Sequence, residues 1–575
     1  QPIGQNVSRN HHSSAGDEQR SMDAPSDDQR KKRKKGLPKG RQITPDALQY
    51  VQRILGDQPR DGSLLIEFLH RIQDDQGHLS SANLAALAHE LKLSQAEVYE
   101  VASFYHHFEI VKEDDKSPAQ YTVRVCGSIA CEMAGSEALF NQLEKNLGSA
   151  VRIVHAPCMG ACDKAPVASM GKHQFPHCSV EDIGKAAESD AVTPIIPDYE
   201  SVDAYGERGG YETLKKLRAG SLAGSDILEE LEAAGLRGMG GAGFPVARKW
   251  KFLEGSEKPR TLVVNADEGE PGTFKDRLCL EDQPHQFLEG TLIAAHTVEA
   301  GDVYIYLRDE YPHIHEILSR EIAALEESSI SLPVRLHLRR GAGAYICGEE
   351  TALLESLEGK RGLPRNRPPY PAQKGLYGRP TLINNVETLH WVSLIMQNGA
   401  QWYLDQGQPR FYSVSGRVKN PGVVRAPSGT TARQLIEEHC GGMADGERFT
   451  AYLPGGASGG ILPAALADVP LDFGTLEEHG CFVGSAAVVV FSDLDDMRSV
   501  ARNLIGFFED ESCGQCTPCR IGCEKLLTLM AGEEWDGDLM RDLAGTMRDA
   551  SICGLGQAAP NPVLSTLKFF LEDKL

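Results

Sequence analysis

The sequence lacks any apolar run near the ~18 residues that a membrane-spanning helix needs, and no signal peptide is visible in it. We therefore expect a cytoplasmic protein without membrane contact. Positive charge is scarce: 59 Lys and Arg stand against 81 Asp and Glu, a formal net charge of −22. This balance argues against a general nucleic-acid binder, which would present a basic face. The 14 cysteines in 575 residues do not make a disulfide scaffold. Their clustering predicts metal binding in a reducing compartment.

The length predicts several domains, about four at roughly 150 residues each. Residues 1–42 are polar, almost free of large apolar side chains, and are predicted to be a disordered tail. The basic run from Arg30 to Lys35 lies within this tail. It could serve as a nuclear signal, a tether to an anionic surface or a docking arm for an acidic partner, and a solvated tail is the simpler interpretation.

Residues 43–118 are predicted to form a helical lead-in. Leu65, Phe68, Leu69 and Ile72 recur at the spacing of one helix face. Ser94 and Glu97 have the spacing of a capping box, which predicts the start of another helix. The pattern indicates a helical segment before the first cysteines.

Residues 119–190 are predicted to hold the first metal centre. Cys126 follows a predicted strand with Cys131 four residues further on, and Cys158 and Cys162 follow a second strand over 151–154. Four thiolates from two loops that face each other suit a [2Fe–2S] cluster. Zinc is the main alternative, since these spacings are tolerable for a tetrahedral metal.

Residues 191–405 alternate predicted strands, over 261–264, 302–307 and 334–338, with helices, which predicts a parallel α/β sheet. Glycine-rich residues 235–245 could bring backbone amides close to a phosphate. Acidic and amide groups follow the strands at 265–270 and 348–350, at the edge where such sheets bind ligands. They suit the hydroxyls of a ribityl chain and the N–H groups of an isoalloxazine. A magnesium–nucleotide site is the competing interpretation, and the Gly-Lys-Ser/Thr element it needs is missing.

Residues 406–492 are predicted to be a small α+β unit, with strands near 412–416, 422–424 and 486–491 and turns over most of the interval before the last. Residues 493–575 have helical periodicity and hold Cys513, Cys516 and Cys519 in a C-x2-C-x2-C run. Such thiolates converge on one point, as a [4Fe–4S] cluster requires. Cys553 is favoured as the fourth ligand over Cys523, and zinc or plain reduced thiols are the alternatives.

Two stretches resemble known families. Residues 45–185, with Ala102 to Tyr105 and the two cysteine pairs, resemble the thioredoxin-like [2Fe–2S] subunit of respiratory complex I. The loops around Gly238, Asn265 and Glu349 resemble the flavin-binding subunit of complex I, which is shared with NAD-linked formate dehydrogenases and NAD-reducing hydrogenases. The resemblance implies a multidomain α/β chain: a thioredoxin-like [2Fe–2S] domain, an FMN-binding α/β domain, a β-grasp (ubiquitin-like) module and a C-terminal helical bundle with a [4Fe–4S] cluster.

The resemblance also implies the binding residues. FMN would contact Gly238, Lys249, Asn265, Asp267, Glu268, Tyr345, Gly348, Glu349, Asn384, Asn385 and Thr388. NADH would stack on Phe244 and approach Phe252, Glu270, Glu350, Arg367 and Tyr370. The [2Fe–2S] ligands would be Cys126, Cys131, Cys158 and Cys162, and the [4Fe–4S] ligands Cys513, Cys516, Cys519 and Cys553.

The implied function is that of a diaphorase, which exchanges hydride between NAD(H) and FMN and single electrons with the clusters, with no protein residue needed as acid or nucleophile. Hydrogenase relatives of this fused form commonly lose cysteines in the first domain, and bifurcating ones tend to append a ferredoxin-like tail. The expectation is therefore the diaphorase subunit of an NAD-dependent formate dehydrogenase, partnered by a molybdenum- or tungsten-containing catalytic subunit. The alternatives are a hydrogenase or complex I-type diaphorase and, from a different class, an iron–sulfur scaffold that binds no nucleotide.

Overall fold

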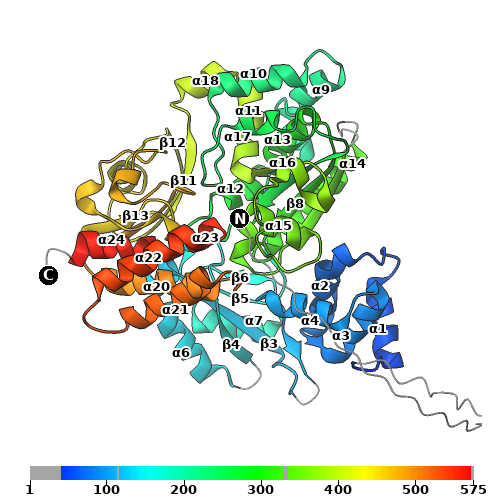
Figure 1. The fold of residues 1–575 in the computed structure, drawn as a ribbon, viewed down its shortest axis with the longest axis horizontal. Helices are drawn as coiled ribbons and strands as arrows, with labels where there is room; N and C mark the ends of the chain where they lie inside the picture. The colour runs from blue at the N-terminus through cyan, green and yellow to red at the C-terminus, as the bar shows by residue number, and fades with distance from the viewer. Residues whose placement is uncertain (1–39, 113–114, 149–150, 329, 331–333, 572–575) are drawn as a thin grey trace, which may run out of the picture. The chain divides into compact units, whose positions relative to one another are not determined.

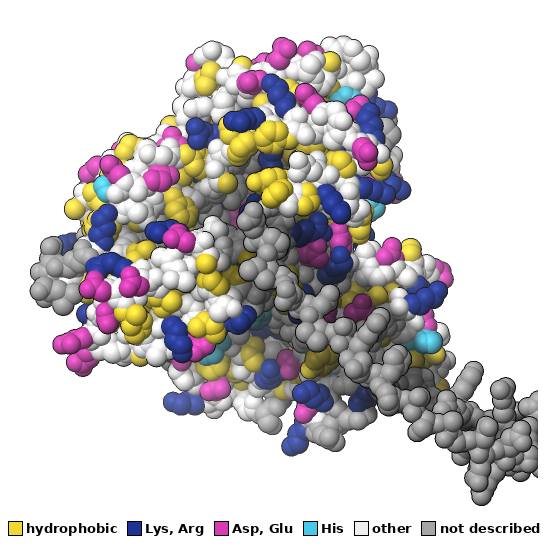
Figure 2. Space-filling view, in the orientation of Figure 1, with side chains coloured by type: hydrophobic (Ala, Val, Ile, Leu, Met, Phe, Trp, Pro, Cys, Tyr) yellow, Lys and Arg dark blue, Asp and Glu magenta, His cyan; other side chains and the backbone are white. Residues whose placement is uncertain are grey.

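The computed structural model describes residues 40–112, 115–148, 151–328, 330 and 334–571 (Figure 1). The predicted tail lies outside these residues apart from 40–42, as does its basic run. Across the described residues, we find no helix long and apolar enough to cross a membrane. On the face shown in Figure 2, side chains of both charge signs are interspersed.

The helical lead-in forms as expected, and the capping box of Ser94 and Glu97 opens its last helix. A two-stranded parallel pair, β1 with β2, closes this segment. The elements are α1 (Pro45–Leu55), α2 (Leu65–Gln76), β1 (Leu79–Ser80), α3 (Ser81–Leu91), α4 (Gln95–Phe104) and β2 (Ile110–Val111).

The first cysteine-bearing segment builds a sheet in the order β4-β3-β5-β6 within its described part. Strands β3 and β4 run parallel, and β5 and β6 continue the sheet antiparallel. The elements are β3 (Tyr121–Cys126), α5 (Ile129–Met133), α6 (Ser136–Asn146), β4 (Val151–Ala156), β5 (Ala168–Met170), β6 (His173–Phe175) and α7 (Val180–Ser189).

The central sheet is parallel throughout, in the order β10-β7-β8-β9. It contains the three strands predicted from the sequence and a fourth, β10, that was not predicted. The elements are α8 (Val202–Glu207), α9 (Glu212–Arg218), α10 (Gly224–Ala234), α11 (Val246–Lys251), β7 (Arg260–Ala266), α12 (Lys275–Asp282), α13 (Pro284–Thr297), β8 (Ala300–Leu307), α14 (Pro312–Glu327), β9 (Arg335–Arg340), α15 (Glu350–Leu357), α16 (Pro371–Lys374), β10 (Thr381–Asn385), α17 (Val386–Asn398) and α18 (Ala400–Asp405).

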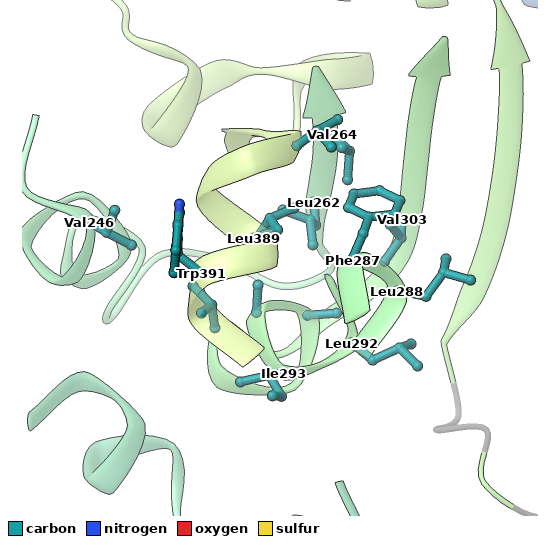
Figure 3. Close-up of a cluster of buried hydrophobic side chains, with 14 of the residues drawn as sticks. Val246, Leu262, Val264, Phe287, Leu288, Leu292, Ile293, Val303, Leu389 and Trp391 are labelled. Carbon is teal, nitrogen blue, oxygen red and sulfur yellow. The ribbon is translucent and has the colours of Figure 1, made fainter. Parts of the chain in front are cut away.

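The pleat of this sheet divides its side chains between two cores. Leu262, Val264 and Val303 lie in one core with residues of α13 and α17, including Phe287 and Trp391 (Figure 3). The residues that alternate with them point the other way. Val263, Tyr306 and Ile383 share a second core with α15 and with the lead-in helices. The lead-in is therefore packed on the central sheet.

The next segment forms a mixed sheet in the order β12-β11-β15-β13-β14. Strand β13 occupies a stretch for which turns were predicted. The elements are β11 (Arg410–Gly416), β12 (Gly422–Ala426), α19 (Ala432–Gln434), β13 (Phe449–Leu453), β14 (Leu462–Pro463) and β15 (Ala487–Ser492). The chain ends in the expected helical bundle: α20 (Met497–Asp510), α21 (Thr517–Met530), α22 (Gly537–Ala550), α23 (Gly554–Ala558) and α24 (Asn561–Thr566).

Candidate functional site

The glycine-rich loop is closed on itself and lies against the start of α17. Gly238 N donates to Phe244 O at 2.9 Å, and Met239 N donates to Thr388 Oγ1 at 2.9 Å. Gly243 has φ +63°, and a Cβ there would lie 2.7 Å from the Phe473 ring. A Cβ on Gly240 would come within 3.2 Å of Asn385. Only glycine lets this backbone come so close to a helix N-terminus, which is an arrangement that suits a phosphate.

Three asparagines gather at the carboxyl ends of β7 and β10. Asn384 is paired with Val264 and Asn385 with Asn265 in the parallel register, so their side chains reach the same edge of the sheet. Asn265 Nδ2 donates to Gly348 O, and Trp250 Nε1 donates to Asn384 Oδ1, each at 2.9 Å. Asn385 caps α17 by accepting from Thr388 N.

Two carboxyl groups follow β7 and differ in their surroundings. Asp267 Oδ2 is buried without a hydrogen-bond partner, and burial holds the pKa of this carboxyl well above its usual range. Glu268 instead accepts from Asp276 N, Arg277 N and Tyr311 Oη, at 2.8, 3.1 and 2.9 Å. Burial, together with the Asp276 charge, raises the pKa of Glu268 to about 7. The unpaired Asp267 oxygen is the kind of group that a bound flavin would satisfy.

The loop over 345–349 closes over these acids. A Cβ on Gly348 would lie 3.4 Å from Asp267 O, so the two loops are in contact. Glu349 caps α15 by accepting from Thr351 N and Ala352 N, both at 2.9 Å. The Tyr345 hydroxyl donates to Glu270 at 2.5 Å. The structure therefore brings the predicted flavin residues of three loops to one edge of the sheet, where they fit FMN.

Exposed aromatic and charged side chains flank this edge. Phe244 and Phe252 are 38% and 53% exposed, and their ring centroids lie 5.8 Å apart. Tyr370 is also 53% exposed. Glu350 lies 3.6 Å from Lys249 Nζ and 3.2 Å from Arg367 Nη1. Open aromatic faces beside paired charges suit the stacking and recognition of a nucleotide.

Glu270, predicted to approach NADH, is held from two sides. Besides the Tyr345 hydroxyl, it accepts from the backbone N and the hydroxyl of Ser458, both at 2.7 Å. Ser458 was not predicted from the sequence to lie in the site. The glycines around it are its only local signal, because a serine in a glycine-rich turn carries no distinctive spacing.

A buried charged cluster behind the glycine loop was also missed. Lys275 Nζ lies 2.9 Å from both Asp276 Oδ1 and Glu387 Oε2. Asp276 Oδ2 accepts from Asn385 Nδ2 at 2.6 Å. The charged run that begins with Lys275 and Asp276, shortly before the buried Cys279 and Leu280, was the available signal. The cluster fixes the orientation of the Asn385 amide.

The first four predicted cysteine ligands come together. Cys126, Cys131, Cys158 and Cys162 are each at most 4% exposed, and none forms a disulfide. The Sγ atoms of Cys158 and Cys162 lie 3.4 Å apart, and the Cys126 thiol is close enough to hydrogen-bond with Cys131 and Cys158. Four buried thiols on two facing loops fit a [2Fe–2S] cluster.

The second set lies at the start of α21. Cys513 and Cys516 are half-buried, and Cys519 and Cys553 are buried. A Cβ on Gly556 would lie 2.8 Å from Cys519 Cβ, so the turn that carries Cys553 returns to the C-x2-C-x2-C run. Cys523 lies one helical turn beyond Cys519 and is fully buried. The arrangement fits a [4Fe–4S] cluster held by Cys513, Cys516, Cys519 and Cys553.

Known protein families match four parts of the chain. The thioredoxin-like [2Fe–2S] ferredoxin matches residues 51–189, and the Nuo51 FMN-binding domain matches residues 231–394. The SLBB domain matches residues 411–462, and the NADH-ubiquinone oxidoreductase-F iron-sulfur binding region matches residues 499–574. These matches confirm the predicted multidomain α/β fold.

Curated relatives and solved structures agree with these matches. A subunit of an NADH-quinone oxidoreductase of Rhizobium meliloti is 42% identical over 398 residues, which is 66% of this chain and 94% of that protein. A subunit of the NADH-quinone oxidoreductase of Escherichia coli is 41% identical over 394 residues, 65% of this chain and 88% of that protein. A chain from the crystal structure of an NAD+-reducing [NiFe]-hydrogenase in the air-oxidized state superposes with a TM-score of 0.78 at 32% identity. It covers 90% of this chain and 94% of its own. Together these likenesses confirm FMN, NAD(H), a [2Fe–2S] and a [4Fe–4S] cluster as the cofactors.

Proposed function

Because the chain belongs to a family of NADH-quinone oxidoreductase subunits, the NADH-binding flavin and iron–sulfur diaphorases, we propose that it serves an NAD-dependent formate dehydrogenase. In that complex it would transfer electrons from formate to NAD+. The overall reaction would convert formate and NAD+ into carbon dioxide and NADH. A molybdenum- or tungsten-containing catalytic subunit with further iron–sulfur clusters would oxidise the formate. The concentration of reduced cysteines supports the cytoplasm as its compartment.

The supporting observation is that all four cysteines of the first domain are present and converge. The fused hydrogenase relatives that this chain resembles commonly lose cysteines there. An intact first cluster site therefore favours the formate assignment. Nothing in the sequence pointed to a site for molybdopterin, nickel or quinone, so the second substrate is assigned to a partner chain.

A second candidate is the diaphorase subunit of an NAD-reducing hydrogenase. The observation in its favour is the solved hydrogenase chain, which matches this chain across nearly its whole length. The third alternative, an iron–sulfur scaffold that binds no nucleotide, conflicts with the match to the FMN-binding domain.

FMN, when bound, supplies the exchange of a hydride with NAD(H) and of single electrons with the clusters. The residues of this chain would bind FMN and NAD(H) and orient them relative to each other. The glycine loop and the start of α17 would hold the phosphate, and Asn265, Asp267 and Asn384 would hold the ribityl chain and the ring. Phe244 and Phe252 would stack the nucleotide, with Glu350 and its two basic neighbours beside it. Orientation, without a protein acid or base, is then the contribution of the protein.

The test is purification of the native complex with its partner subunits. Metal analysis and NAD+ reduction would be measured with formate and with hydrogen as alternative donors. Molybdenum or tungsten with formate-driven reduction is the expected result. Nickel with hydrogen-driven reduction would overturn the formate assignment and leave the diaphorase role in place.

The nucleotide-binding residues are tested separately in the same complex. Phe244→Ala should raise the KM for NADH several-fold while the flavin content stays at the wild-type level, because Phe244 lies outside the predicted flavin contacts. Tyr99→Ala removes a comparably exposed aromatic of the helical lead-in, and it is the matched control. An unchanged KM in the Phe244 variant would remove this residue from the nucleotide site.

A further inference from the structure

Arg308 follows β8 directly, and its guanidinium is 4% exposed. It joins the flavin loop to the first cluster loop. Nη2 donates to Cys158 O at 2.5 Å, and Nη1 donates to Glu268 O. Nε donates to Glu310 Oε2 at 3.1 Å. A full positive charge is thus held in the interior, directly against the backbone of one predicted cluster ligand.

A second arginine touches the same loop and differs in its charge balance. Arg277 donates to Gly160 O at 2.7 Å and to both oxygens of Asp163 at 2.8 and 3.0 Å. Its Nε also lies 3.5 Å from Glu281. Two carboxylates therefore offset the charge of Arg277. The ion pairs of Arg308 involve only Glu310, among the described residues, and Glu310 is 20% exposed and partly screened by water.

A positive charge near a cluster favours its reduced form, because reduction adds one negative charge. The effect is larger in the interior than at the surface, since water screens a buried charge poorly. Arg308 is placed for such an effect, because its Nη2 lies 2.5 Å from the carbonyl oxygen of Cys158.

We propose that Arg308 sets the reduction potential of the [2Fe–2S] cluster: its guanidinium, fixed between Glu268 and Cys158, raises that potential and so favours electron entry from the flavin. In this step one electron passes from reduced flavin to the oxidised cluster. Arg308 itself exchanges no electron and no proton. The inference rests on the proposed ligand role of Cys158.

The test is an EPR-monitored redox titration of the [2Fe–2S] cluster in the purified holoprotein, with dithionite and mediators and without NAD(H) or formate. The readout therefore does not depend on which substrate the partner subunit oxidises. Arg308→Gln should make reduction of the cluster about tenfold less favourable, a downward shift of about 59 mV for a one-electron couple. Arg308→Lys keeps the charge and should stay closer to wild type.

Arg340→Gln is the matched control. Arg340 ends β9, is 16% exposed, and pairs with Asp309 and Asp74. Its ion pairs join the central sheet to the lead-in helices and do not involve the Cys158 loop. Its removal should leave the cluster potential at the wild-type value. An equal shift in both arginine variants would overturn the proposal, because loosened packing would then explain it.

A second variant, expected to shift the reduction potential upward, tests the proposal if Arg308→Gln fails to assemble the cluster. Glu310→Gln removes the carboxylate that pairs with Arg308 and should raise the potential. A potential unchanged or lowered in Glu310→Gln would overturn the proposal. So would a wild-type potential in an Arg308→Gln protein that carries its full iron content.

Discussion

Glu511 Oε2 accepts a hydrogen bond of 2.9 Å from the backbone N–H of Tyr345. The bond ties the loop that precedes Cys513 to the loop over 345–349, which closes on the predicted flavin site. Tyr345 is also held at its other end, where its hydroxyl donates to Glu270. Its ring lies 5.0 Å from that of Phe507 on α20. One residue therefore contacts the parts of the chain that are predicted to hold the flavin, the nucleotide and the [4Fe–4S] cluster.

Glu511→Ala should lower stability and slow electron transfer to this cluster. Glu511 is buried, so the substitution would leave the Tyr345 N–H without a partner, at a cost of about 1–3 kcal/mol. Glu511→Gln keeps an oxygen acceptor and should behave nearly as wild type. The measurements are the thermal melting midpoint and freeze-quench EPR of cluster reduction by NADH. Equal behaviour of the two variants would show that the hydrogen bond is unimportant.

Ser458→Ala should raise the KM for NADH by about 2–10-fold, the range expected for one hydrogen bond of about 0.5–1.5 kcal/mol. The substitution removes the hydroxyl donor to Glu270 and keeps the backbone donor. Steady-state NADH oxidation with an artificial acceptor measures the effect. Ser499→Ala, which removes a hydroxyl that donates to Asp496, the N-cap of α20, is the control. A changed kcat at constant KM would argue against a role in nucleotide binding.

Cys553→Ser should abolish the [4Fe–4S] signal and reduce the iron content by about four atoms per chain. Cys523→Ser should keep both, because Cys523 lies one helical turn beyond the C-x2-C-x2-C run and is not one of the four proposed ligands. Iron analysis and EPR of the two proteins decide between the candidates. Retention of the cluster in Cys553→Ser and its loss in Cys523→Ser would reverse the assignment.

The carboxyl of Glu268 gives the fold a pH dependence. Its pKa is raised from 4.5 to about 7, first by burial and then by Asp276. Between these values the folded protein keeps a proton that the unfolded chain has lost, so the free energy of unfolding falls as pH rises. The contribution is fully present below pH 4.5 and is lost as pH rises through about 7.

Glu268→Gln should therefore flatten the fall in melting temperature between pH 5 and 7.5 relative to wild type. A shift of about 2–4 °C accompanies each kcal/mol in a domain of 150–250 residues. Scanning calorimetry at several pH values, on the first thermal transition, measures it. The same slope in both proteins would mean that Glu268 is ionised throughout this range.

The sequence was most informative where local pattern decides structure. Strands β7 and β8 were predicted because their apolar residues fill a buried sheet. Strand β10 was not, because it ends in Asn384 and Asn385, which have low strand propensity and are tolerated here at a binding edge. Strand β13 lies among glycines that indicated turns. Its pairing with β15 depends on residues about 40 positions away along the chain.

The residues of the candidate site were likewise predictable only in part. Cysteine spacing alone was sufficient to predict two clusters, since ligands must converge. The flavin residues came from family resemblance, and their placement at one edge agrees with it. Arg308, Arg277 and Tyr311 had no signal, because their partners on the Cys158 loop lie more than 100 residues away in sequence. Contacts of that kind are set by tertiary packing.

The shared core of the lead-in helices has a consequence for the order of folding during synthesis. Residues 47–108 emerge early, yet their core also contains Val263, Tyr306, Leu354, Leu376 and Ile383. At about 5–20 residues per second, the ribosome needs about 14–55 s to pass from residue 108 to residue 383. During that interval the apolar faces of α2 and α4 stay exposed, because the strands that bury them have not yet been synthesised. We therefore expect chaperones to bind the lead-in, and its burial to follow the folding of the flavin domain.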